Sequence, residues 1–320
     1  MKPFPEASTR EAYGKALVEL GKELPDLVVL DADLSTSTMT KYFAREFPSR
    51  FFDCGLAEQN LMGIAAGLAA AGRTAFASTF ASFATARAFD QIRVNIAMPH
   101  LNVKVVATHA GISVGEDGIS HQAIEDLALM GSLPGFTVIV PADAPETVQA
   151  VRAAARTAGP FYIRLSRPKT PVVHGDGYSF SIGKAEVLRE GRDATIIACG
   201  LMVARALYAA EGLAEEGLSA RVLNVATLQP LDEKAIIQAA RETGAVVTAE
   251  EHLAHGGLGS LVAQVLGRNH PAPLEMVALK DYAESGQAEE LLEKCCLTPQ
   301  AIADAVKRAV SRKGGPGNKA

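Results

Sequence analysis

Residues 103–122 read VKVVATHAGISVGEDGISHQ, an apolar run followed directly by a glycine-rich segment with two histidines. The run Val103–Thr108 predicts a strand buried on both faces, which is typical of a parallel sheet covered by helices. His109 follows this strand directly, and His121 lies near the end of the glycine-rich segment. Because parallel α/β sheets bind ligands at the carboxyl ends of their strands, the segment is predicted to belong to a functional site.

Similar apolar runs alternate with helical segments through the first half of the chain. Further strands are expected at residues 27–30, 73–78, 137–140 and 161–165. Helices are expected at residues 9–22, 58–71, 83–97, 121–129 and 145–158. Ser8 or Thr9 can cap the first helix and Asp143 the last, since their side-chain oxygens accept free backbone N–H groups. This alternation predicts an α/β fold with a parallel sheet covered on both faces.

A polar connector rich in proline and glycine interrupts the alternation at residues 168–192. Within it, Gly175-Asp176-Gly177 is interpreted as a turn, because the asparagine of a metal–diphosphate loop does not follow at the expected distance. A second alternating series begins with a strand at residues 194–198. The chain is therefore predicted to hold two α/β domains, residues 1–180 and a smaller one at 181–312, with a disordered tail at 313–320.

Composition and charge exclude several classes of function. The formal net charge of −5 argues against a nucleic-acid-binding surface, which is usually basic. No apolar run is long enough to span a bilayer, and the N-terminus lacks the apolar core of a secretory signal. The four cysteines show no C-x-x-C spacing, so neither a zinc site nor a disulfide framework is expected. We expect a cytoplasmic protein that binds neither nucleic acid nor membranes.

Glu58 begins a helix that is rich in alanine and glycine and almost free of charge. A glutamate in a first turn is ordinary, because the helix dipole favours negative charge there. The charge-poor helix is predicted to be buried, however, and a buried carboxylate needs a basic partner or keeps its proton. Phe80 and Phe83 share a helical spacing that suits either core packing or a platform for a flat heterocycle. Arg167, Arg10 and Lys169 are candidates for phosphate contacts or ordinary surface charges.

These segments together resemble the C-terminal half of the transketolase family. The resemblance covers roughly residues 6–312 and rests on residues 55–59, 78–83, 108–122, 141–143 and 165–167. It implies a pyrimidine-binding thiamine diphosphate domain followed by a transketolase C-terminal-like domain. The diphosphate- and Mg²⁺-binding domain of the family precedes these two, and this sequence has no counterpart of it.

The resemblance also implies roles for individual residues. Glu58 is similar to the glutamate that contacts the aminopyrimidine of the cofactor, and Phe80 and Phe83 to the aromatic residues beside that ring. Catalytic roles are implied for Glu58, His121 and His109. Contacts with the sugar phosphate substrates are implied for Arg10, Ser37, His109, Asp117, His121 and Arg167. Two positions depart from the family pattern: Ala86 replaces a frequent tyrosine, and Gln59 replaces a frequent histidine.

No metal ligands are expected from this chain, so Mg²⁺ and the cofactor diphosphate call for a separate N-terminal subunit. The resemblance therefore implies the C-terminal subunit of a split transketolase in an α2β2 heterotetramer, active only with its partner. The alternatives are the C-terminal part of a 1-deoxyxylulose-5-phosphate synthase, the β subunit of a 2-oxo acid dehydrogenase, and a non-catalytic scaffold subunit. The form of residues 113–117 favours ketol transfer over condensation of pyruvate.

Overall fold

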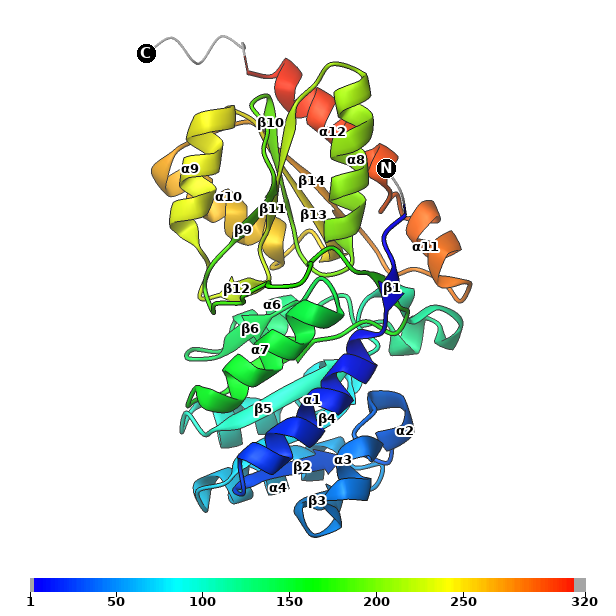
Figure 1. Cartoon of the computed structure of the whole chain (residues 1–320), viewed down its shortest axis with the longest axis vertical. Helices are drawn as coiled ribbons and strands as arrows, with labels where there is room; N and C mark the ends of the chain where they lie inside the picture. The colour runs from blue at the N-terminus through cyan, green and yellow to red at the C-terminus, as the bar shows by residue number, and fades with distance from the viewer. Residues whose placement is uncertain (1–2, 314–320) are drawn as a thin grey trace.

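A seven-stranded sheet with the order β12-β6-β7-β5-β4-β2-β3 forms the centre of the N-terminal half (Figure 1). Six of its strands are parallel, and only β12 runs antiparallel, against β6. The strands are β2 (Leu27–Asp31), β3 (Phe51–Asp53), β4 (Thr74–Phe80), β5 (Val103–Thr108), β6 (Thr137–Ile139), β7 (Phe161–Arg164) and β12 (Thr227–Gln229). The parallel α/β fold expected from the alternating pattern is therefore confirmed.

Helices cover both faces of this sheet. One face packs against α1 (Thr9–Glu23) and α7 (Ala144–Arg156), whose N-termini are capped by Ser8 and Asp143 as expected. The other face packs against α4 (Glu58–Ala70), α6 (Asp126–Gly131) and the π-helical segments η2 (Phe83–Arg87) and η3 (Ile92–Ala97). The smaller elements are β1 (Glu6–Ala7), α2 (Ser35–Thr38), α3 (Lys41–Glu46), η1 (Pro48–Arg50), α5 (Phe89–Gln91), η4 (Ile112–Asp117), η5 (Ile119–His121) and β8 (Thr170–Pro171).

Two of the expected helices do not form over the predicted residues. The helix expected at residues 83–97 is broken into π-helical turns, in which the Ala88 N–H donates to the carbonyl of Phe83. The helix expected at residues 121–129 begins only at Asp126, because the preceding residues are extended. An isolated bridge, in which the Gly111 N–H donates to the Ala123 carbonyl at 2.8 Å, holds them in that form. Residue spacing alone could not reveal this bridge.

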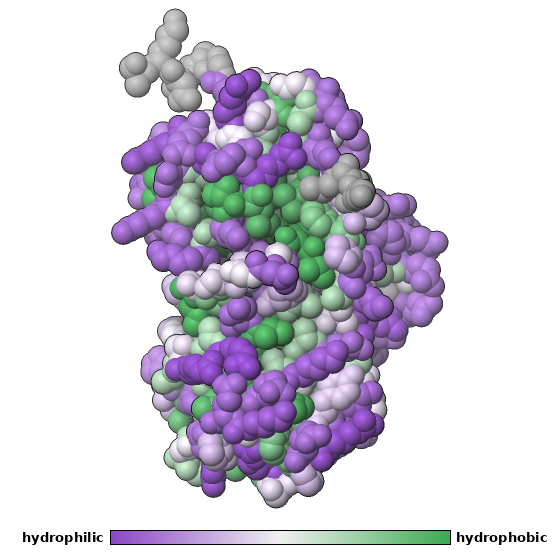
Figure 2. Space-filling view, viewed as in Figure 1, coloured by the Kyte–Doolittle hydropathy of each residue, from purple (hydrophilic) through white to green (hydrophobic). Residues whose placement is uncertain are grey.

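A five-stranded sheet with the order β14-β13-β10-β11-β9 forms the C-terminal half. Helices α8 and α12 pack on one face and α9 and α10 on the other, so this half is also layered (Figure 1). Apolar residues gather over the sheet between α9 and α8, whose outer surfaces are largely hydrophilic (Figure 2). The elements are β9 (Glu186–Arg189), β10 (Ala194–Ala198), α8 (Met202–Glu215), β11 (Ala220–Asn224), α9 (Glu233–Thr243), β13 (Val246–Leu253), α10 (Leu258–Asn269), β14 (Leu274–Leu279), α11 (Ala288–Lys294) and α12 (Pro299–Ser311).

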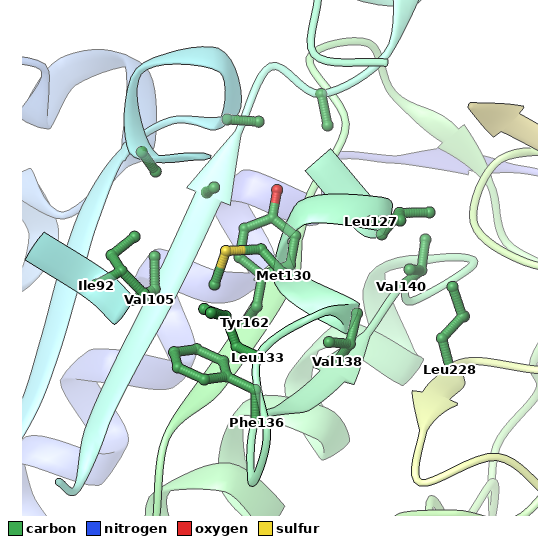
Figure 3. Close-up of a cluster of buried hydrophobic side chains, with 14 of the residues drawn as sticks. Ile92, Val105, Leu127, Met130, Leu133, Phe136, Val138, Val140, Tyr162 and Leu228 are labelled. Atoms are coloured by element: carbon green, nitrogen blue, oxygen red, sulfur yellow. The ribbon is translucent and has the colours of Figure 1, made fainter. Parts of the chain in front are cut away.

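Strand β12 joins the two halves, because it comes from the C-terminal half and completes the first sheet. Its Leu228 lies in the same apolar cluster as Val138 and Val140 of the N-terminal half (Figure 3). The domain boundary at residue 180 stays a prediction. The structure describes residues 3–313, so the expected disordered tail lies outside the described residues except for Lys313. Within the described range no helix is both long and apolar enough to cross a membrane.

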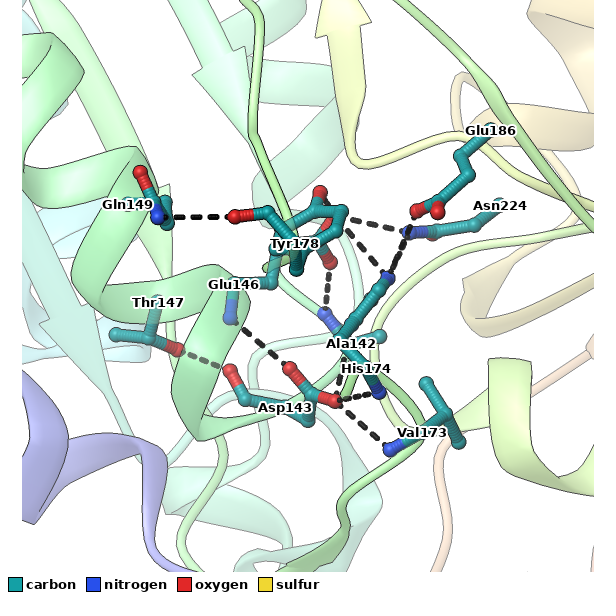
Figure 4. A network of polar contacts seen from close by, with 10 residues as sticks. All are labelled: Ala142, Asp143, Glu146, Thr147, Gln149, Val173, His174, Tyr178, Glu186 and Asn224. Carbon is teal, nitrogen blue, oxygen red and sulfur yellow. Dashed lines mark hydrogen bonds and ion pairs between the residues drawn. The ribbon is translucent and has the colours of Figure 1, made fainter. Parts of the chain in front are cut away.

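A buried polar network also connects the two halves (Figure 4). His174 lies in the connector, where its Nδ1 is 2.9 Å from Oδ2 of Asp143 at the start of α7. Its Nε2 is 3.1 Å from Glu186 on β9 and 3.4 Å from the Asn224 amide on β11. The expected turn at residues 175–177 is confirmed, since the Tyr178 N–H donates to the Gly175 carbonyl. The connector therefore holds both halves through a charged cluster as well as through β8 and β9.

Candidate functional site

The carboxyl edge of the seven-stranded sheet brings most of the sequence-predicted site residues together. Phe80 ends β4, His109 follows β5, and Arg167 follows β7. Glu58 is the first residue of α4, after β3. These strands are parallel neighbours, so residues far apart in the sequence converge at one edge, as the sequence pattern indicates.

The aromatic and imidazole rings form a continuous stack at this edge. Phe80 and His109 are stacked with ring centroids 3.8 Å apart, and Phe80 and Phe83 lie 5.7 Å apart at 23°. His121 meets Phe83 edge-on at 5.1 Å. Phe80 is buried, whereas Phe83 keeps part of its surface open. The π-helical turn that breaks the expected helix places Phe83 in this stack, and such turns are frequent at functional sites.

Glu58 is buried, as expected, and it has the basic partner that a buried carboxylate requires. Nη1 of Arg87 donates to Oε1 of Glu58 at 2.8 Å. The same guanidinium lies 4.3 Å above the Phe83 ring. Sequence reasoning missed Arg87, although its position one helical turn after Phe83 is a visible signal. The carboxylate is therefore connected to the aromatic stack through a single arginine.

His109 lies in a setting that favours the neutral imidazole. Burial, together with the positive charges of Arg10 and Arg167 and the ring of His121, lowers the pKa of His109 to about 3. The hydroxyl of Thr108 lies 2.8 Å from Nδ1 and fixes the ring. A neutral imidazole can both donate and accept a hydrogen bond, which suits contact with a hydroxyl or a carbonyl group.

Arg10 binds backbone groups of two other predicted site residues. Its Nη1 donates to the Ser37 carbonyl at 2.6 Å and its Nη2 to the Arg167 carbonyl at 2.9 Å. Burial and the charge of Arg167 lower the pKa of Arg10. The Nε of Arg10 is buried and has no partner in the described part of the chain. Ser37 takes part through its carbonyl, and Arg10 keeps one donor that a bound anion can accept from.

Arg167 is tied to the glycine-rich segment. Its Nη1 donates to the Val114 carbonyl, and its Nη2 lies 3.9 Å from Oδ1 of Asp117. Both side chains are about one-third exposed. Arg167 therefore presents a partly open positive charge beside His109, which is the kind of group that binds a phosphate.

Asp31 at the end of β2 is a further residue that sequence reasoning missed. Its carboxylate accepts hydrogen bonds from the Leu34 N–H and from the hydroxyls of Thr38 and Thr40. Burial raises its pKa to about 6. These bonds fix the turn that carries Ser37 toward Arg10. Asp31 thus organises the edge of the site through the turn that follows β2.

No metal centre accompanies these residues. Within residues 3–313 no group of three or more His, Cys, Asp or Glu side chains is placed to hold a metal ion. The site residues described above supply a buried carboxylate, two stacked phenylalanine rings, two imidazoles and three guanidinium groups.

Comparisons with known proteins agree with this geometry. The model of the transketolase pyrimidine binding domain matches residues 5–172, and that of the transketolase C-terminal domain matches residues 183–302. A protein of Methanocaldococcus jannaschii described as a transketolase C-terminal section is 46% identical over 95% of this chain and 96% of its own length. A 6-deoxy-6-sulfo-D-fructose transketolase subunit of a Clostridium strain is 42% identical over 95% of each chain.

A solved structure agrees as well. It is described as a split-gene transketolase in the form of an inactive β4 tetramer, and it is 53% identical with a TM-score of 0.90. The match covers 97% of this chain and all of that one. The chain therefore belongs to the transketolase family and corresponds to its C-terminal part, which consists of the pyrimidine-binding and C-terminal domains.

Proposed function

We propose that the chain is the C-terminal subunit of a split transketolase, which transfers a two-carbon ketol unit between sugar phosphates with thiamine diphosphate. The observation that carries the proposal is the buried carboxylate of Glu58, which Arg87 connects to the stacked rings of Phe83 and Phe80. An aminopyrimidine needs such a carboxylate at a ring nitrogen and apolar surfaces against its flat faces.

The residues present fit the pyrimidine end of this cofactor. Besides Glu58 and the ring pair, the buried hydroxyl of Ser82 has no hydrogen-bond partner in the described part of the chain, so a polar group remains available there. When bound, thiamine diphosphate supplies the electron sink that allows a carbon–carbon bond of a ketose to break. For Mg²⁺, the described part of the chain holds no group of three or more His, Cys, Asp or Glu side chains placed as ligands.

The other residues of the edge are assigned to the substrate. Neutral His109 and the imidazole of His121 contact the hydroxyl and carbonyl groups of the sugar, where they orient it and exchange protons. Asp117 contacts an acceptor hydroxyl. Arg167, with the free Nε of Arg10, binds the terminal phosphate.

A separate N-terminal subunit completes the site in this proposal, in an α2β2 heterotetramer. The charge-poor helix α4 is buried on only one face, and a Cβ atom added at Gly63 or Gly67 meets nothing within 4 Å. Large apolar side chains are also exposed on Leu56 just before α4, and on Val94 and Met98 in and after η3, which packs against α4. Uncovered apolar surface of this kind is typical of an interface with another protein.

A ketol-transfer assay tests the proposal. Xylulose 5-phosphate and ribose 5-phosphate are supplied with thiamine diphosphate and Mg²⁺, first to the chain alone and then to the chain co-expressed with a diphosphate-domain subunit. We expect activity only in the pair. Activity with pyruvate instead of xylulose 5-phosphate would favour the synthase or dehydrogenase alternative. Full activity of the single chain would refute the requirement for a partner subunit.

The role of Glu58 is tested in the same pair. Glu58→Gln keeps the size of the side chain but removes the carboxylate, so turnover is expected to fall at least about 100-fold. Glu293→Gln, at an exposed position of the C-terminal half, is the matched control and should leave turnover unchanged. Unchanged turnover in the Glu58 variant would favour a scaffold subunit.

A further inference from the structure

A buried carboxylate of the C-terminal half reaches the functional site. Glu251 belongs to β13 of the second sheet and is only 3% exposed. Its Oε1 accepts a hydrogen bond from the backbone N–H of Ser113 at 2.6 Å. Ser113 lies between the two site histidines, in residues 110–120, which we call the histidine loop. The contact crosses from one half of the chain to the other.

The backbone of the histidine loop lies directly against this carboxylate at Gly111. A Cβ atom at Gly111 would lie 2.2 Å from the carboxyl carbon of Glu251, far inside contact distance. Gly111 also has a φ of +77° and a ψ of −170°, a conformation that is essentially reserved for glycine. Only glycine at this position lets the carboxylate reach the Ser113 N–H.

Arg164 fixes the backbone on both sides of the same contact. Its Nη2 donates to the carbonyl of Glu251 at 2.9 Å and to the carbonyl of Ala123 at 3.1 Å. Its Nε donates to the buried carboxylate of Asp126 at 2.7 Å. Arg164 therefore links β13 to the residues that follow the histidine loop, so neither strand nor loop can shift alone.

Further hydrogen bonds connect the two halves near the histidine loop. The hydroxyl of Ser285 donates to the Glu116 carbonyl, and the Gln287 amide donates to the Glu116 carboxylate. The Gln122 amide donates to the carbonyl of Glu284. The two bonds of Glu116 are exposed, and pairs of exposed polar groups contribute little to stability, whereas Gln122 is buried and follows the loop. Glu251 thus makes a buried polar contact with the loop, beside the apolar packing of Ile112 against the C-terminal half.

We propose that Glu251 is a positioning residue, through which the C-terminal domain holds the histidine loop and so sets the places of His109 and His121. Glu251 touches neither ring, and it acts on them through the backbone at Gly111 and Ser113. The inference rests on the proposed function, because it assigns the pair of imidazoles to the substrate. It gives the C-terminal domain a part in the reaction beyond assembly.

Alanine at this position tests the proposal in the complex with the partner subunit. Glu251→Ala removes the acceptor of the Ser113 N–H, and a positional error of about 1 Å at a catalytic group can cost about 100-fold in rate. We expect kcat to fall at least about 10-fold, while the KM of the donor sugar and the affinity for thiamine diphosphate change less than twofold. Glu251→Gln still presents an oxygen to Ser113 and should restore most of kcat.

A double-mutant cycle isolates the contact from general damage. Gly111→Ala introduces the clash with the Glu251 carboxylate, which is absent once residue 251 is shortened to alanine. The double variant should therefore lose less activity than the product of the two single losses. Glu293→Ala, on the exposed surface of the same half, is the control and should leave kcat unchanged. Strictly multiplicative losses would overturn the proposal.

A spectroscopic readout separates this inference from the proposed function. The ring-proton NMR signals of His109 and His121 are recorded in the full chain without substrate. Glu251→Ala should shift both signals and leave that of His174 in place, whatever the reaction catalysed by the complex. If the wild-type pair transfers no ketol unit, the proposed function fails, and the NMR result still decides the positioning role. Unmoved histidine signals, or a kcat within twofold of the wild type, would overturn it.

Discussion

The guanidinium of Arg87 lies 2.8 Å from the carboxylate of Glu58 and 4.3 Å above the ring of Phe83. Glu58 is almost fully buried, whereas half of the Arg87 side chain is exposed. The arginine thus satisfies a buried charge from the solvent side and shields one face of the aromatic pair. In the proposed function, this guanidinium lies next to the ring that the cofactor would contact.

Arg87→Gln should destabilise the chain, because it leaves the buried carboxylate of Glu58 without its cation. A hydrogen bond to a charged group is worth about 1.5–3 kcal/mol, and the exposure of Arg87 reduces this, so we expect a loss of about 1–2 kcal/mol. Urea unfolding at neutral pH measures it. Arg93→Gln is the matched control, since it breaks an exposed pair with Asp90 and should cost less than about 0.5 kcal/mol. Equal stability of the two variants would contradict the role of Arg87.

His109 should stay neutral across the physiological pH range. Burial and the charges of Arg10 and Arg167 lower its pKa to about 3, so its ring-proton NMR signals should not move between about pH 5 and about pH 8. Arg167→Met removes one of the two positive charges and should raise that pKa. Lys169→Met is the control, because Lys169 is not among the groups that act on His109. A His109 signal that titrates near neutrality would contradict this setting.

The pKa of His174 is shifted in the opposite direction to that of His109. Burial disfavours its charge, but the hydrogen bond with Asp143 and the charges of Glu146, Asp143 and Glu186 outweigh burial and raise its pKa above 6.5 (Figure 4). The folded chain therefore binds this proton more tightly than the unfolded chain does. The resulting stability is fully present below pH 6.5 and is lost as the pH rises through the folded pKa.

The variant His174→Gln should lose about 2–3 kcal/mol at about pH 6, because it removes a buried charge that is hydrogen-bonded on both sides. The difference from the wild type should shrink as the pH rises through the folded pKa of His174, because the proton is then lost in both states. Urea unfolding across this range measures it. His255→Gln, at an exposed position, should change stability by less than about 0.5 kcal/mol. A stability difference that grows with pH would show that folding lowers, rather than raises, the pKa of His174.

Local signals predicted the elements that carry the site. The strand at residues 103–108 and the caps at Ser8 and Asp143 follow from a few adjacent residues, and the structure confirms them. Parallel topology then places His109 and Arg167 at one edge without further information. The resemblance to the family added Glu58 and the phenylalanine pair, which periodicity left open between core packing and a binding platform.

Contacts between distant segments could not be predicted in this way. Arg87 meets Glu58 across 29 residues, and Ser113 meets Glu251 across 138 residues. Strand β12 comes from the other half of the chain and joins the edge of the first sheet. There it pairs with β6 alone. These pairings depend on how the two sheets pack, and no local spacing encodes that packing. The extended stretch before α6 is missed for the same reason, since its partner is Gly111.

Met98 should contribute to binding of the partner subunit rather than to stability of the chain. It follows η3 beside α4, and the residue is 65% exposed, which is unusual for so apolar a residue. Met98→Gln keeps the length of the side chain and makes it polar, so unfolding of the single chain should change by less than about 0.5 kcal/mol. At an interface the same change loses apolar burial of about 1–2 kcal/mol, or about 10-fold in affinity.

Titration calorimetry with the diphosphate-domain subunit measures that loss. Met276→Gln, on β14 of the second sheet, is the matched control, because Met276 is also exposed but lies in the other half of the chain. We expect the affinity to fall in the Met98 variant alone, since Met98 follows η3, which packs against α4, the helix that begins at Glu58 and has open space at Gly63 and Gly67. If both variants bind the partner like the wild type, the apolar surface around Met98 is not the interface, and the partner must complete the site from another side.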